Sequence, residues 1–320
     1  MNANTGNPIS PQEAEELRSK VESLNASGLS WAMIHKESGI PQGTLSPWVA
    51  GKYGGDNNNV AMRVRGWLDQ REERAELTRR VPAPPDFQAT PTSSAILNRL
   101  QYAHHLSDFA MISGGPGIGK TAAVIQYKAT HPQVFVVTCS PSCSGVQTIL
   151  ADILAAVGGG DKGTPQAMSR KITAKLAETS AFLIIDEAQH LTANAVEELR
   201  AIHDRANVAL ALIGNEDLYS RFSSMTEASM HAQVRSRIGM WYRQLRPSPQ
   251  DVEVLAKAWN IDDPKALGFL RDIAMKPGAL RGVTKVLRLA SILKDDDGPI
   301  SYSVIKAAWS QLSTEIGRAA

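Results

Sequence analysis

Short apolar runs alternate with segments of helical periodicity through the middle of the chain. Each run is a stretch of β-branched or aliphatic residues, and the segments between the runs are amphipathic. Such runs separated by helices are typical of strands in a parallel sheet that is buried on both faces. The pattern therefore predicts an α/β domain between about residues 95 and 246. The predicted strands are residues 109–113, 134–139, 182–185, 209–213 and 240–245.

The segment before this domain shows helical periodicity and turn residues. Residues 12–24 place apolar side chains on one face of a predicted helix. Ser30 is a suitable N-cap for a second helix, which Gly39 would end, and a third short helix is predicted over residues 42–49. A charged helix is predicted over residues 60–80.

A proline-rich segment, residues 81–94, follows the charged helix. We interpret it as a semi-extended linker, because proline fixes φ and cannot continue a helix. After the α/β domain, the pattern predicts four further helices and no strand, near residues 249–258, 264–275, 279–294 and 301–313. The expected parts are an N-terminal helical domain (1–60), a helix with a linker (61–94), an α/β core (95–246) and a C-terminal helical domain (247–320).

Composition and charge narrow the function classes only slightly. The chain has 320 residues, of which 43% are hydrophobic and 21% charged, as in an ordinary globular protein. Its formal net charge is +2, and residues 1–80 carry ten basic and ten acidic side chains. Bulk electrostatics therefore gives no argument for nucleic acid, and any DNA-binding face must be a local patch.

The same inventory bears on the compartment. The two cysteines, Cys139 and Cys143, are too close together to join domains, and we interpret them as reduced thiols. The N-terminal residues lack a signal pattern, and no apolar run approaches the roughly 18 residues that a membrane span needs. We expect a cytoplasmic protein with no membrane partner.

The first predicted strand runs directly into a glycine-rich loop with the spacing Gly-x-x-x-x-Gly-Lys-Thr. Its glycines let the backbone curl so that successive N–H groups point toward a phosphate, and the start of the next helix adds partial positive charge. Lys120 can reach the β- and γ-phosphates of a nucleotide, and the Thr121 hydroxyl can bind Mg²⁺. We therefore predict an ATP and Mg²⁺ site. The loop comprises Gly114, Gly115, Pro116, Gly117, Ile118, Gly119, Lys120 and Thr121.

Two acids follow the third predicted strand. Asp186 would hold the Mg²⁺ through water, and Glu187 would orient and polarise the attacking water. Acids also favour the start of a helix, which is the plainer explanation of this pair. The glycine-rich loop roughly 65 residues upstream favours the catalytic interpretation.

Four further polar residues follow or precede predicted elements. Asn215, after the fourth strand, would stand beside the γ-phosphate, although it could also cap a loop. Arg235 and Arg237 precede the fifth strand, where one of them could stabilise the ATP of a neighbouring subunit. Arg281 opens the third C-terminal helix and could fold back onto the phosphates. Local pairing or simple solvation remains open for all three arginines.

The order of these parts resembles that of the AAA+ ATPases over about residues 90–295. With a helix-turn-helix before the core, the whole chain resembles the family of the phage Mu transposition protein B, the ATP-dependent activators of target DNA. The resemblance implies a three-layer core with a helical lid. It also implies a homo-oligomer, as a ring or helical filament, on double-stranded DNA, and delivery of that DNA to a transposase. Ser236-Arg237 resembles the Ser-Arg pair of related ATPases, so we favour Arg237 over Arg235.

Residues 29–48 fit a repressor-like helix-turn-helix. In that motif Gln42, Thr44 and Ser46 would face a DNA groove. His35 departs from the pattern, because a small residue usually lets the two helices touch there. A small helical bundle that contacts proteins is the alternative interpretation.

A second DNA surface is implied by the resemblance alone. In related DNA-loading ATPases the loop after the second strand lines the duplex, which points to residues 140–145. Ser142 and Ser144 could donate hydrogen bonds to phosphates there. The nearest basic cluster, which could equally be a solvated helix face, comprises Lys162, Arg170 and Lys171.

Two other function classes stay open at the level of sequence. One is a replication ATPase of the helicase-loader or clamp-loader type, and the other is a DNA-binding regulator whose nucleotide only switches its assembly. Glu187 disfavours the regulator, since a switch needs no water-activating acid, and the helix-turn-helix disfavours a clamp loader.

Overall fold

The computed structural model describes residues 9–80, 86–160, 162–223, 232–294 and 298–313. The chain forms two compact units, Met1–Pro82 and Ala83–Ala320. The N-terminal residues that were assessed for a signal, and residues 81–85 of the predicted linker, lie outside the described residues.

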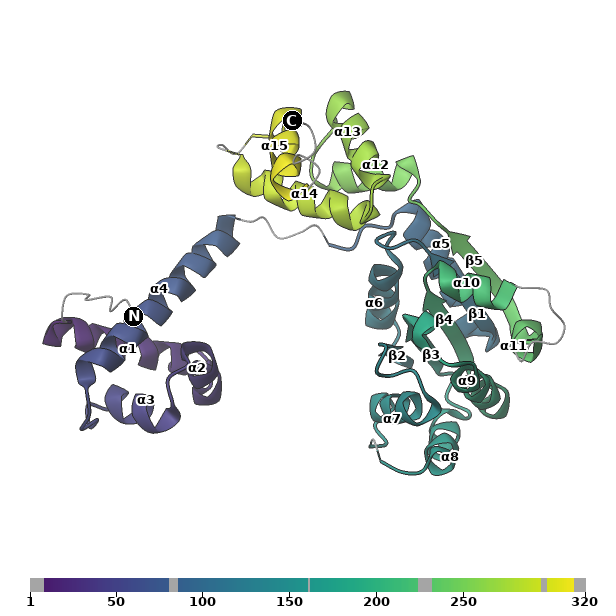
Figure 1. Cartoon of the computed structure of the whole chain (residues 1–320), viewed down its shortest axis with the longest axis horizontal. Coiled ribbons are helices and arrows are strands. Elements are labelled where there is room, and N and C mark those ends of the chain that lie inside the picture. Colours follow the sequence, from purple (N-terminus) through teal and green to yellow (C-terminus); the bar gives the residue numbers. More distant parts are fainter. Residues whose placement is uncertain (1–8, 81–85, 161, 224–231, 295–297, 314–320) are drawn as a thin grey trace. The chain divides into compact units, whose positions relative to one another are not determined.

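The first unit consists of four helices whose bounds match the predictions closely (Figure 1). The Ser30 side chain caps α2 by accepting a hydrogen bond from the Met33 N–H, and Gly39 ends that helix in the left-handed conformation at φ 64°. His35 is accommodated at the turn, where its Nδ1 lies 3.0 Å from the carbonyl oxygen of Ile40. The helices are α1 (Pro11–Ala26), α2 (Trp31–Ser38), α3 (Gln42–Val49) and α4 (Asn57–Arg80).

Helix α4 belongs to the core of this unit. Its first turns bury Val60, Ala61, Val64 and Trp67 against the other three helices. The boundary expected at residue 60 therefore falls inside a packed helix, because that helix has an apolar face among its charges.

The expected linker is wrong over residues 91–94, which form the start of α5 (Pro91–Leu106). The Thr90 side chain accepts a hydrogen bond from the Ser93 N–H, and Pro91 occupies the first helical position. Proline is favoured there because the first N–H of a helix has no intrahelical acceptor to lose. This proline therefore starts a helix rather than preventing one.

The second unit contains a parallel sheet of five strands in the order β2-β3-β4-β1-β5, which confirms the predicted α/β class. Alternate residues along each strand face two different apolar clusters, so the sheet is buried on both faces. Helices α5 and α6 cover one face, and α7, α8 and α9 cover the other, giving three layers (Figure 1). The strands are β1 (Phe109–Gly114), β2 (Val134–Thr138), β3 (Phe182–Asp186), β4 (Ala209–Gly214) and β5 (Ile238–Gln244).

The connecting helices place the loops that follow the strands. The short turn η1 (Ala188–His190) follows β3 directly, before α9. The remaining connections are α6 (Lys120–Thr130), α7 (Val146–Ala156), α8 (Pro165–Leu176), α9 (Ala193–Ala206), α10 (Glu216–Ser223) and α11 (Ala232–Arg237).

Four helices close the second unit, as the sequence predicts. They pack around an apolar cluster of their own, which we call the lid core. The fully buried carboxylate of Asp251 joins the lid to the α/β core, because it accepts from the Thr92 N–H at 2.8 Å and from the Thr92 hydroxyl at 2.6 Å. The lid helices are α12 (Pro249–Ala258), α13 (Pro264–Ala274), α14 (Ala279–Leu293) and α15 (Tyr302–Leu312).

In open parallel sheets, ligands bind outside the carboxyl ends of the strands. Here the glycine-rich loop begins at the last residue of β1, Asp186 ends β3 with Glu187 directly after it, and Asn215 follows β4. These three strands are neighbours in the sheet. The fold therefore brings the glycine-rich loop, the two acids and Asn215 together at the carboxyl ends of the strands. Among the residues that the model describes, no helix is both long enough and apolar enough to span a membrane.

Candidate nucleotide-binding site

The glycine-rich loop lies against the end of β5, and this contact explains two of its glycines. The Gly115 N–H donates to the Gln244 carbonyl at 3.0 Å. A Cβ atom at Gly114 would lie 2.6 Å from the same carbonyl oxygen, and one at Gly115 would lie 2.0 Å from the carbonyl oxygen of Leu245. Only glycine lets the loop approach the neighbouring strand this closely. Gly119, at φ 104°, then turns the chain into α6.

Lys120 begins α6 and folds over the loop. Its Nζ donates to the carbonyl oxygens of Gly114 at 2.7 Å and Gly115 at 2.9 Å. Burial lowers the pKa of Lys120, whereas the nearby charges of Glu187 and Asp186 raise it. The ammonium group is therefore held against the glycine-rich loop, with the carboxylates of Glu187 and Asp186 close by.

Thr121 and Asp186 meet directly. The Thr121 hydroxyl donates to Oδ2 of Asp186 at 3.0 Å, although the two residues are 65 positions apart in the chain. Burial raises the pKa of Asp186, and hydrogen bonds from the Glu187 N–H and the Thr121 hydroxyl act against that rise. Mg²⁺ prefers hard oxygen ligands such as a hydroxyl and a carboxylate, so Thr121 and Asp186 together fit a magnesium ion.

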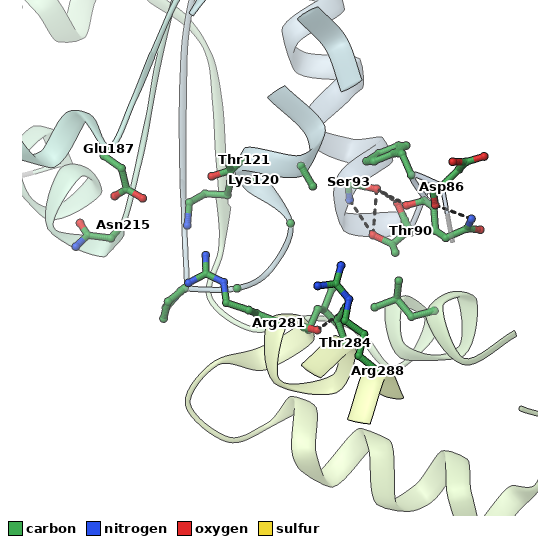
Figure 2. A pocket seen from close by; sticks show the side chains of 18 of the residues that line it. Asp86, Thr90, Ser93, Lys120, Thr121, Glu187, Asn215, Arg281, Thr284 and Arg288 are labelled. Atoms are coloured by element: carbon green, nitrogen blue, oxygen red, sulfur yellow. Dashed lines mark hydrogen bonds between the residues drawn. The ribbon is translucent and has the colours of Figure 1, made fainter. Parts of the chain in front are cut away.

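Glu187 and Asn215 lie on the opposite side of the pocket from the lid (Figure 2). Glu187 adopts a left-handed backbone conformation at φ 55°, which turns the chain sharply after β3. Its Oε2 accepts a hydrogen bond from Nε2 of Gln189 at 2.5 Å, and Oε1 of the same glutamine accepts from the Asn215 N–H at 3.2 Å. Gln189 was not singled out by the sequence.

The lid supplies the remaining wall. Arg281, in the first turn of α14, reaches toward Lys120 (Figure 2), and its charge lowers the pKa of that lysine. Gly117 of the loop lies under Gly278, so that a Cβ atom at Gly117 would be 2.1 Å from the Gly278 carbonyl oxygen. The phosphate loop and the start of α14 are therefore in direct backbone contact.

Together these residues enclose a pocket of about 590 Å³, a volume in the usual range for small-molecule sites. Of the residues predicted for the site, Pro116, Gly117, Gly119, Lys120, Thr121, Glu187, Asn215 and Arg281 line it. Gly114, Gly115, Ile118 and Asp186 lie behind that surface and support it.

The far end of the pocket was missed by the sequence interpretation. It is formed by the segment before α5 and by the lid, with apolar side chains such as Phe87, Leu255 and Trp259 beside polar ones. Thr284 and Arg288 of α14 face Ser93 of α5 and Thr90, the N-cap of α5, across this end (Figure 2). The Thr90-Pro91 pair was a usable signal, because it marks a helix start where we expected a linker.

Arg235 and Arg237 lie away from this pocket. Both are exposed on α11, directly before β5, and Ile238 of β5 pairs with Phe109 at the amino end of β1. Nε of Arg237 lies 3.3 Å from Oδ1 of Asp204. The pocket lies at the carboxyl ends of the strands. The six residues of β1 separate the two ends of the sheet by about 20 Å, at a rise of roughly 3.3 Å per residue. Neither arginine reaches the phosphate loop of its own chain.

The residues predicted to contact DNA fall in both units. On α3, Gln42 is exposed, and Thr44 and Ser46 are half-buried. In the second unit, Ser142 is exposed and Ser144 half-buried in the loop before α7. Nε2 of Gln147 donates to the Gly163 carbonyl at 3.0 Å, which places the start of α7 beside the turn before α8. The predicted basic residues Lys162, Arg170 and Lys171 are exposed on that turn and helix.

Comparison with known proteins agrees with this geometry. An AAA domain model matches residues 104–222, and the model of the C-terminal part of the Mu B transposition protein matches residues 236–312. The ATP-dependent target DNA activator B of Escherichia phage Mu is 33% identical over 289 residues, which cover 90% of this chain and 91% of that protein. The Mu-like prophage FluMu DNA transposition protein B of Haemophilus influenzae is 32% identical over 82% of this chain and 91% of its own length.

Solved structures support the fold alone. A structure of Drosophila ORC bound to DNA superposes with a TM-score of 0.52 at 16% sequence identity, covering 74% of this chain and 65% of that one. The core and lid of the second unit therefore have the AAA+ fold.

Proposed function

Since this chain belongs to the Mu B transposition protein family, we propose that it is an ATP-hydrolysing protein that assembles on target DNA and delivers that DNA to a transposase. The observation that carries the proposal is the pocket, where the phosphate loop, Glu187 and Asn215 come together beneath an arginine from the lid, with Asp186 behind the Thr121 hydroxyl. The relatives are named as target DNA activators and transposition proteins, which favours transposition over a role in replication.

The residues of the pocket divide the work of binding ATP. The N–H groups of the phosphate loop and the start of α6 bind the phosphates, and Lys120 exchanges its two carbonyl partners for phosphate oxygens. Arg281 adds a second positive charge from the lid, so that ATP holds the lid against the core. The far end of the pocket offers the apolar side chains of Phe87, Leu255 and Trp259 to the nucleoside.

Hydrolysis rests on Glu187. Its carboxylate accepts a hydrogen bond from the attacking water and orients it toward the γ-phosphate, with Asn215 beside it. Thr121 and Asp186 would hold Mg²⁺, which neutralises charge that develops on the phosphates. A nucleotide-switched regulator would need none of the water-orienting groups.

The position of α11 supports the proposal that the chain forms a homo-oligomer. Arg237 is exposed and too distant from its own pocket, so we assign it to the ATP of a neighbouring copy of this chain, with Arg235 as the alternative. We further propose that Gln42, Thr44 and Ser46 contact duplex DNA from the first unit. The loop at Ser142 and Ser144 and the basic residues near α8 would contact it from the second. We also propose a cytoplasmic site of action, which is the cytoplasm of the host cell if the chain is phage-encoded.

Imaging of negatively stained protein with duplex DNA tests this function. We expect rings or filaments on DNA when ATP is present, and few when ATP is omitted. ATP turnover should rise when DNA is added, because DNA aligns neighbouring subunits. Lys120→Ala is the matched control and should show neither assembly nor turnover. ATP-dependent assembly without any turnover would favour the nucleotide-switched regulator instead. Assemblies that form equally well without ATP would contradict both the proposed function and the regulator.

A further inference from the structure

The side-chain amide of Gln189 bridges the proposed catalytic acid and the neighbouring strand. Its Nε2 lies 2.5 Å from Oε2 of Glu187, and its Oε1 lies 3.2 Å from the backbone nitrogen of Asn215. The glutamine is half-buried in the wall of the pocket. One side chain therefore contacts two of the groups that we assign to hydrolysis.

The chemistry of the partners fixes the orientation of this amide. A carboxylate only accepts hydrogen bonds and a backbone N–H only donates them. The NH₂ end must therefore face Glu187 and the oxygen must face Asn215, and a flipped amide would lose both bonds. Since one oxygen of the Glu187 carboxylate is held in this way, the other is directed by the same bond.

Two neighbours hold Gln189 in place. Arg221 of α10 donates to the carbonyl oxygens of Gln189 at 3.0 Å and Leu191 at 2.6 Å, which anchors the turn η1. Gly214, the last residue of β4, leaves space for the amide, since a Cβ atom there would lie 2.6 Å from Oε1 of Gln189. The turn after β3 and the end of β4 are thus shaped around this side chain.

We propose that Gln189 is a positioning residue for ATP hydrolysis, which aims the Glu187 carboxylate and ties its position to the end of β4. Any displacement of the Asn215 backbone, such as one that follows contact of its side chain with the γ-phosphate, is passed to Glu187 through a single rigid amide. This inference rests on the proposed function, because it presupposes that Glu187 orients the attacking water.

The kinetic test compares Gln189→Met with wild type. Methionine keeps the length of the side chain but makes neither bond, so Glu187 loses its alignment while the phosphate loop is unchanged. We expect kcat to fall by about 10- to 100-fold, the cost of a small misplacement of a catalytic group, with KM and the affinity for a fluorescent ATP analogue within about twofold. Gln126→Met, at a half-buried glutamine of α6 outside the pocket, is the matched control and should keep its kcat.

A second variant separates the two hydrogen bonds. Gln189→Glu keeps an acceptor for the Asn215 N–H but removes the donor to Glu187 and places two carboxylates side by side, which repel each other. Its kcat should fall at least as far as that of Gln189→Met. If it retained wild-type turnover, the bond to Glu187 would have no part in catalysis.

Gly214→Ala tests the same point with Gln189 intact. The added methyl group collides with Oε1 of Gln189 and displaces the amide, so the same fall in kcat at nearly constant KM is expected. A kcat within twofold of wild type in both Gln189→Met and Gly214→Ala would overturn the proposal. So would an equal loss of ATP affinity and turnover, because Gln189 would then support the pocket rather than the carboxylate. Absence of turnover in the wild-type protein would instead refute the proposed function.

Discussion

Lys120 and Asp186 each carry a charge that their surroundings oppose. Burial lowers the pKa of the lysine and raises the pKa of the aspartate. Both shifts mean that burial destabilises the charged form of the side chain. A phosphate beside Lys120 and a divalent cation beside Asp186 would stabilise these charged forms. Perturbed pKa values of this kind cluster at functional sites. The site is therefore electrostatically suited to bind a metal-bound polyphosphate.

Glu187→Gln should separate binding from hydrolysis. The amide keeps the size of the side chain but cannot act as a base, so turnover should fall by about 10²–10⁴-fold while ATP affinity is retained. Steady-state turnover and equilibrium ATP binding measure the two effects. Glu178→Gln is a matched control, because Glu178 also has a left-handed backbone (φ 61°) but is exposed outside the pocket. Unchanged turnover in Glu187→Gln would remove Glu187 from its role.

At this scale the sequence reveals residues whose type and position together are informative. The lysine, the threonine and the acids could be predicted because each stands at a fixed offset from a strand end. Gln189 could not, since a glutamine has no chemistry of its own and acquires a role only when the fold brings Asn215 beside it. Arg288 was similarly hidden, because its position in the pocket depends on how α14 packs.

The contact between the phosphate loop and α14 decides whether the pocket can form. Gly117 has φ 78°, and a side chain there would overlap the Gly278 carbonyl. Gly117→Ala should therefore weaken ATP binding by at least tenfold, or about 1.4 kcal/mol, measured by titration with a fluorescent ATP analogue. Gly158→Ala controls for backbone strain, since Gly158 has φ 71° with open space around it. Equal ATP affinity in the two variants would show that the contact with α14 is unimportant.

Elements were predictable where local signals agree with packing. The strands and the four lid helices matched their predicted ranges within a few residues, because continuous apolar runs and helical periodicity mark buried surfaces directly. The start of α5 was not predicted, because Pro91 was interpreted as a helix breaker. Proline is tolerated in the first turn of a helix, where α5 has it. The boundary predicted at residue 60 was wrong because the many charges of α4 obscured the apolar face with which it packs in the first unit.

A test of the whole assembly concerns Arg237. An arginine supplied by a neighbouring subunit can contribute about 10³–10⁵ in rate, and only when subunits touch. Arg237→Ala should bind ATP normally yet hydrolyse it slowly, and the specific activity of wild type should rise steeply with protein concentration. Mixing Arg237→Ala with Lys120→Ala should restore part of the activity, since the second variant still offers its arginine to the intact pocket of the first.

The mixture also contains its own control. Each variant alone should stay nearly inactive at the same total concentration. In the mixture, Lys120→Ala, which does not assemble alone, should enter the ATP-bound assemblies that Arg237→Ala forms on DNA. If the mixed assemblies remained as inactive as their components, Arg237 would not act across the interface, and Arg235 would be tested in the same way.

The joint at Asp251 determines how the second unit melts. The lid core and the two clusters that flank the sheet share no residues, so each could in principle lose its structure alone. Asp251 connects the lid to the α/β core. Its carboxylate accepts a hydrogen bond from the Ser248 N–H at the start of α12 and two hydrogen bonds from Thr92 of α5. In calorimetry the unit should therefore unfold in a single cooperative transition.

Asp251→Ala would leave the two buried Thr92 donors without this acceptor, at about 1–3 kcal/mol each, and would also remove the acceptor of the half-buried Ser248 N–H. It should split that transition so that the lid melts first. Asp263→Ala, which removes the exposed N-cap of α13, should lower the melting temperature slightly but keep one peak. A single peak in Asp251→Ala would mean that other contacts carry the coupling. Two peaks in Asp251→Ala would mean that, in wild type, this one carboxylate couples the unfolding of the lid to that of the core. The lid and the core would then respond as one cooperative unit to heat, as they do to ATP in the proposed function.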